Sequence, residues 1–104
     1  MADDVLYKRP SEKISYAYDF TPKLQSDSGL SASSVTAVDE EGTNVSSSIV
    51  SSSTASGLVV TGILQAGSDG KDYLVTFQAT GTTSADIRQW VVELRVRSYI
   101  GGTL

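Results

Sequence analysis

The chain has 104 residues, 39% of them hydrophobic, and its 12 acidic and 8 basic side chains give a formal charge of −4. This length suits one domain, and the acidic balance removes the broad attraction that nucleic acid or an anionic membrane would need. The sequence has no Cys and no His. It therefore excludes disulfides and thiolate chemistry, and it lacks the commonest general base and metal ligand. We expect no enzyme activity, no cofactor and no metal.

Hydroxyl side chains make up over a quarter of the chain, with 17 Ser and 10 Thr, whereas the helix-forming residues Glu, Lys, Arg and Met are scarce. Thr, Val, Ile, Tyr and Phe favour strands, and Ala, Leu, Glu, Lys and Arg favour helices. The composition therefore predicts an all-β fold before any periodicity is considered.

The first predicted strand covers residues 14–20, where apolar and aromatic side chains recur at every second position. Such alternation is typical of a half-buried strand. Pro22 follows and ends the strand, because proline has no N–H for the ladder. A shorter strand is predicted over residues 35–38, and the acidic turn at residues 39–42 stops it.

The middle of the chain, residues 44–56, is nearly a serine repeat and gives no clear period. A solvated loop would account for this composition. We prefer a weak edge strand over residues 45–50, anchored by its few apolar side chains, followed by a flexible loop.

Three further strands are predicted over residues 58–64, 73–79 and 90–96, each with an apolar side chain at every second position. The last two have one apolar and one mixed or charged face, as expected of an antiparallel sheet with one solvated side. Trp90 lies on the apolar face. We therefore assign it to the core rather than to a stacking platform for bases or sugars.

Several short strands with turn signals roughly every 10 residues predict an antiparallel β-sandwich over residues 12–98. Residues 1–11 and 99–104 lack this pattern. We interpret them as an extended N-terminal arm and a C-terminal tail, which in an assembly would lie across a neighbouring subunit. The candidate partner contacts are their large apolar side chains, Tyr7, Tyr99, Ile100 and Leu104.

No motif for chemistry is complete. Ser68 and Lys71 match the Ser-x-x-Lys pattern of penicillin-binding enzymes, but its companion motifs are missing and the match lies in a glycine-bounded turn. The same turn lacks the first Gly and the final Ser or Thr of a phosphate loop. The acids at residues 39–41 lack the closing Glu of a calcium loop. We interpret both segments as turns.

Asp69 precedes Tyr73 by four residues, and Tyr73 opens a predicted strand. This resembles the tyrosine corner of immunoglobulin-like domains, where the Tyr hydroxyl bonds to upstream backbone. Val75 stands where antibody domains carry Cys. The resemblance implies an immunoglobulin-like sandwich without a disulfide.

The sequence GKDYLVTFQATGTTS from Gly70, followed by WVVELRVR from Trp90, resembles small structural proteins of tailed bacteriophages. The resemblance covers about residues 12–98. Such proteins are fibre–tail adaptors or related immunoglobulin-like virion components. It implies a non-enzymatic virion protein that joins tail and fibre components in multiple copies, is made in the host cytoplasm, and binds neither nucleic acid nor membrane.

Two alternatives stay open. One is a capsid decoration (cement) protein, which belongs to the same structural class. The other is a carbohydrate- or surface-binding module, which would need exposed aromatic side chains. Tyr16 and Tyr18 could supply them only if their face of the strand were solvated.

Overall fold

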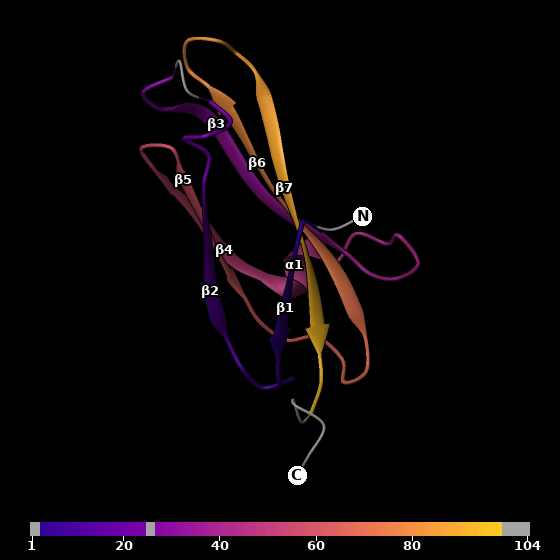
Figure 1. The fold of residues 1–104 in the computed structure, drawn as a ribbon. Coiled ribbons are helices and arrows are strands. Elements are labelled where there is room, and N and C mark those ends of the chain that lie inside the picture. The colour runs from indigo at the N-terminus through magenta and orange to yellow at the C-terminus, as the bar shows by residue number, and fades with distance from the viewer. Residues whose placement is uncertain (1–2, 25–26, 99–104) are drawn as a thin grey trace.

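The computed structural model describes residues 3–24 and 27–98 (Figure 1). Within them the chain forms seven strands and one short helix. In chain order these are β1 (Asp4–Lys8), β2 (Ile14–Asp19), β3 (Leu30–Val38), α1 (Ser46–Ile49), β4 (Val50–Ser56), β5 (Val59–Leu64), β6 (Asp72–Gly81) and β7 (Ile87–Val96). The prediction of an all-β fold is confirmed.

Two sheets pack together as a sandwich (Figure 1). One has four strands in the order β1-β7-β6-β3, and the other has three in the order β2-β5-β4. Neighbouring strands are antiparallel except for β1 and β7, which run parallel. β1 and β2 therefore form the two edges on one side of the sandwich, and β3 and β4 form the edges on the other.

The core lies between the sheets and contains the inward side chains that the alternation predicts. Its fully buried members come from both layers. Those on strands β5, β6 and β7 are Val60, Leu64, Val75, Phe77, Ala79, Val92, Leu94 and Val96. The strands predicted over residues 14–20, 58–64, 73–79 and 90–96 are all present, because each carries its own two-residue period.

Gly62 lies at the middle of β5, on the face that packs against the opposite sheet. A Cβ at this position would come within 3.1 Å of Val35 Cγ1 and within 3.2 Å of Phe77 Cε2. Interiors are close-packed, so there is no free volume nearby to absorb a methyl group. A methyl group at Gly62 would therefore require the Val35 and Phe77 side chains to move by a few tenths of an ångström.

The hydrogen bond expected of a tyrosine corner is present. Tyr73 is 8% exposed, and its hydroxyl accepts a hydrogen bond of 2.9 Å from the backbone N–H of Ser68. The Asp69 carboxylate accepts bonds from the N–H and hydroxyl of Ser98 (2.7 and 2.8 Å). These bonds, with the Ser98 hydroxyl the strongest contributor, hold the pKa of Asp69 below its ordinary value. The turn thus joins the start of β6 to the end of β7.

Residues 1–11 were predicted as an arm outside the sandwich. In the structure Asp4–Lys8 instead forms strand β1, which pairs with β7 over five residues. Its inward positions are Leu6 and Lys8, a pattern that the mixed charges of this segment concealed. Lys8 is fully buried, and its ammonium donates to the carbonyls of Arg9 (2.7 Å) and Pro10 (3.3 Å). Burial lowers the pKa of Lys8.

The serine-rich middle also differs from expectation. The predicted edge strand over residues 45–50 is mainly the helical turn α1, and the predicted flexible loop is strand β4, which pairs with β5. Ile49 anchors α1 because it is 2% exposed and packs in the core. The Ser46 hydroxyl accepts a bond of 2.8 Å from the N–H of Ala37 and so ties α1 to β3.

Asp27 organises the loop between β6 and β7. Its Oδ1 accepts the N–H groups of Thr83 (2.7 Å) and Ser84 (3.0 Å), and its Oδ2 accepts the Ser84 hydroxyl (2.8 Å). These bonds, led by the one from the Ser84 N–H, hold the pKa of Asp27 below its ordinary value. Gly81 has no side chain, and any Cβ there would overlap this carboxylate.

We predict that Gly62→Ala lowers the free energy of unfolding by about 1–3 kcal/mol, the usual cost of overpacking a core. Chemical denaturation followed by Trp90 fluorescence measures it. The matched control is Gly29→Ala, because Gly29 has no atom within 4 Å of its Cβ position and no positive φ. Equal stability of the two variants would contradict the close approach at Gly62.

A second prediction concerns acid stability. Because Asp27 has a lowered pKa in the folded state, its contribution is complete above the unfolded value of about 3.9 and is lost as the pH falls through the folded value. Asp27→Asn should therefore lower the melting temperature at neutral pH, and the difference from the unmodified protein should shrink in acid.

Melting curves between about pH 7 and about pH 2 check this. Asp86→Asn is the control, since it makes the same charge change in the same loop, where the Asp86 carboxylate accepts no hydrogen bond from the described residues. A pH-independent effect of Asp27→Asn would mean that the charge of Asp27 is not what matters.

Candidate functional site: the outer face of the four-stranded sheet

Four large hydrophobic side chains are exposed in the described part of the chain, and all four point outward from the four-stranded sheet. They are Val5 (41% exposed) and Tyr7 (48%) on β1, Leu74 (39%) on β6 and Ile87 (61%) on β7. On β6 the residues on either side of Leu74, Tyr73 and Val75, point the other way and pack in the core. We call these four residues the outer face. Exposed apolar side chains that gather on one surface mark an interaction site.

The register brings part of the outer face together. Val5 and Leu74 both pair with Glu93, one from each side, and Tyr7 pairs with Arg95. Three of the four apolar side chains therefore surround one pair of charged residues on β7. Ile87 lies at the far end of the same strand.

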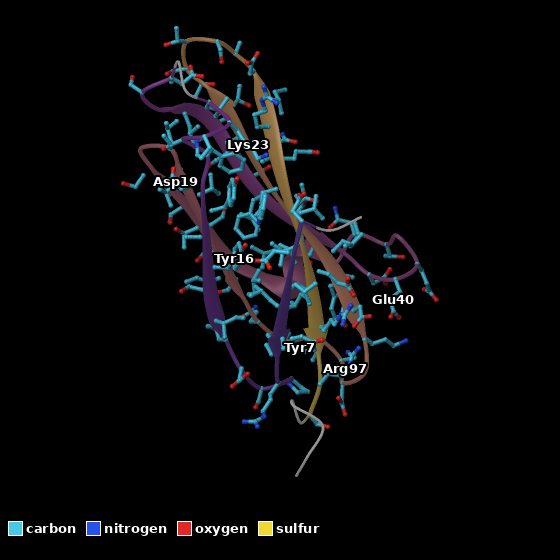
Figure 2. The ribbon with its side chains drawn as sticks, in the orientation of Figure 1. Tyr7, Tyr16, Asp19, Lys23, Glu40 and Arg97 are labelled. Atoms are coloured by element: carbon cyan, nitrogen blue, oxygen red, sulfur yellow. The ribbon has the colours of Figure 1, made fainter. Side chains whose placement is uncertain are left out.

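Tyr7, labelled on β1 in Figure 2, is held in place although it is exposed. Arg95 Nη1 donates to the Tyr7 hydroxyl (2.9 Å), and its guanidinium carbon lies 5.6 Å from the centroid of the Tyr7 ring. Arg95 Nε donates to Glu93 Oε2 (2.9 Å). These partners, Glu93 first, raise the pKa of Arg95 further. A side chain that is already ordered loses less entropy when a partner binds.

A groove borders the outer face where the turn after β3 meets β6. It is lined by Asp39, Glu40, Asp72, Tyr73, Leu74 and Glu93. Two of its carboxylates have a basic neighbour: Arg97 pairs with Asp72 at 2.9 Å, and Lys71 lies 4.0 Å from Glu40.

The acidic segment at residues 39–41 is a turn, as predicted. Asp39 Oδ1 accepts the N–H groups of Glu41 and Thr43, both at 2.9 Å. Among residues 3–24 and 27–98, no three acidic side chains are grouped so that they could hold a metal ion.

Trp90 belongs to the margin of the core. It is partly buried, its ring stacks on Tyr18 at 4.2 Å, and its Nε1 donates to the Tyr16 hydroxyl (2.9 Å). The Tyr16 hydroxyl donates in turn to Asp4 Oδ2 (2.9 Å), and burial raises the pKa of Tyr16. Because Tyr16, Tyr18 and Trp90 pack on one another and on the core, they do not form the open aromatic platform that a sugar-binding module needs.

Of the four residues predicted as partner contacts, Tyr7 lies on the outer face. Tyr99, Ile100 and Leu104 lie outside the described residues. Sequence reasoning missed the other members of the outer face. Leu74 could have been found, because it stands between the inward residues of an evident alternating strand. Val5 gave no such signal because it lies in a strand that was not predicted. Ile87 gave none because it precedes residue 90, where the last strand was predicted to begin.

The chain of hydrogen bonds from Trp90 through Tyr16 to Asp4 fastens β1 to the opposite sheet. We predict that Tyr16→Phe, which removes the central hydroxyl, speeds amide hydrogen exchange in β1 without unfolding the protein. Tyr18→Phe is the matched control, because no hydrogen bond of the Tyr18 hydroxyl is found among the described residues. Equal exchange of β1 in both variants would show that this link does not hold the strand.

No helix in the described ranges is long and apolar enough to cross a membrane.

Comparison with known proteins gives a match to a protein family. The family described as podophage GP4 fiber-tail adaptor protein gp77 matches residues 8–95. No curated protein and no solved structure matches the chain. The family covers most of the chain, including six of the seven strands in whole or nearly so. The chain therefore belongs to this family of structural adaptor proteins of bacteriophages.

Proposed function

We propose that this protein joins tail and fibre components of a phage virion, and that the outer face of the four-stranded sheet is one of its contact surfaces. The observation that carries the proposal is that Val5, Tyr7, Leu74 and Ile87 share this face in a member of a fibre–tail adaptor family. An adaptor needs surfaces that other proteins can cover, and this face has the apolar side chains to provide one.

The chemistry of the outer face suits specific contact. Covering its apolar side chains would contribute roughly 25 cal/mol for each Å² removed from water. The Glu93–Arg95 pair in their midst offers charges of both signs, which in an interface fix orientation more than they add affinity. A complementary partner would therefore present an apolar patch with matching polar groups near its centre.

We further propose that the sandwich is immunoglobulin-like. The strand order, the parallel pairing of β1 with β7 and the bond from Ser68 to the Tyr73 hydroxyl support this. In this view the protein acts by contact and not by catalysis. Its partners are other virion proteins rather than nucleic acid or membrane, which agrees with its net charge of −4.

Co-purification of the protein with tail and fibre proteins of the same virion tests the proposal. The double variant Val5→Lys/Leu74→Lys places two charges on the outer face, one on each side of Glu93. We predict that it folds but binds at least about tenfold more weakly, a loss of about 1.4 kcal/mol or more. Its melting temperature should change little, because both side chains point away from the core.

The matched control is Ser15→Lys/Ala17→Lys, which adds the same charge at exposed positions of β2, on the other sheet. It should bind as the unmodified protein does. If the control loses binding and the outer-face variant keeps it, the contact surface is on the three-stranded sheet. If neither variant affects binding, the outer face is not the contact surface.

A further inference from the structure

The side of the sandwich formed by β3 and β4 has no charged residue and no proline in either strand. The two edge strands on the opposite side both carry charge, with Asp4 and Lys8 in β1 and Asp19 in β2. Soluble proteins usually protect edge strands with charges, prolines or bulges, because unpaired backbone groups invite another strand. One side of this protein is therefore protected by charge and the other is not.

The two unprotected edges differ in how much backbone they leave free. Near the end of β3, both backbone groups of Ala37 are already used: its carbonyl accepts the N–H of Val45, and its N–H donates to the Ser46 hydroxyl. Strand β4 has β5 as its only strand partner among the described residues, and residues 51–56 are all exposed. The only irregularity in its pairing lies at its start, between Val50 and Ser52. Strand β4 is thus the more accessible edge.

The sandwich is also open along this side. Ser53 and Ala55 pair with Gly62 and Val60, whose positions face the core, so both point inward. Both are nevertheless exposed. On β3, Ser33 pairs with the buried Ala79 and is exposed as well. Residues 3–24 and 27–98 therefore leave these inward positions at the edges uncovered.

We infer that β4 pairs antiparallel with β4 of a second copy of the chain, so that two three-stranded sheets become one continuous sheet. Two identical antiparallel strands related by a twofold axis form a self-complementary contact. Opposed Ser and Thr side chains can hydrogen-bond across the pair, and no like charges face one another. In a protein of net charge −4, this uncharged edge is where two copies meet with least repulsion.

This contact goes beyond the proposed function, because it joins copies of the chain and leaves the outer face free for other proteins. Small polar side chains bury little apolar area, so the pairing should be weak in free solution. Copies held side by side in an assembly would pair more completely, because their effective concentration is high. We therefore expect a concentration-dependent dimer.

Two measurements on the unmodified protein test the contact without any variant. Sedimentation velocity from roughly 10 μM to roughly 1 mM, the range of weak complexes, should show conversion of monomer to dimer. Amide hydrogen exchange over the same range should show increasing protection of residues 51–56 and constant exchange in β2. A protein that stays monomeric throughout, or that dimerises without protecting β4, would overturn the proposal.

Matched variants locate the contact. Thr54→Lys places a charge at an exposed position of β4, and Ser15→Lys makes the same charge change at an exposed position of β2, the other edge of the same sheet. We expect Thr54→Lys to weaken dimerisation at least about tenfold and Ser15→Lys to leave it unchanged. Equal effects would overturn the assignment to β4. So would protection of β4 that appears only when another virion protein is added, since a foreign strand would then be the occupant.

Discussion

The close approach of the two sheets at Gly62 is the constraint on which the rest of the structure depends. Val35 and Phe77 lie where a side chain at Gly62 would go, so strand β5 packs directly against β3 and β6 at this point. In strands, a shift by one residue turns every side chain to the other face. Because the inward side chains of β6 and β7 pack in the core, the alternate side chains of these strands lie on the surface. Leu74, Glu93 and Arg95 are held on the surface for that reason.

The sequence predicted those parts of the fold in which a strand shows its own alternation. Tyr73, Val75 and Phe77 mark β6 without help from any neighbour. β1 was missed because its inward positions include Lys8, and because its parallel partner β7 lies far away in the chain. β4 was missed because a uniform run of hydroxyl side chains has no period, although its backbone pairs with β5 with a single irregularity. The candidate partner contacts were harder to predict. Tyr7 was among the predicted contacts, whereas Val5 shares a face with Tyr7 only because β1 pairs with β7.

The two surfaces described above would bind in different ways. The outer face offers side chains: an ordered tyrosine, aliphatic residues and a central ion pair. Such a surface selects a partner by shape and charge. The edge of β4 offers mainly backbone groups, which pair with any suitable extended strand. A small protein with both can join different proteins through one surface and copies of itself through the other.

The central claim is that the outer face is covered in the assembled virion, and hydroxyl-radical oxidation of side chains tests it most directly. The protein would be oxidised free and in isolated tails, and the modified residues would be quantified by mass spectrometry. We predict that Tyr7 and Leu74, both exposed in the free chain, become protected in the tail, while side chains on the outer surface of β2 stay reactive. Equal oxidation of Tyr7 and Leu74 in the two samples would contradict the claim.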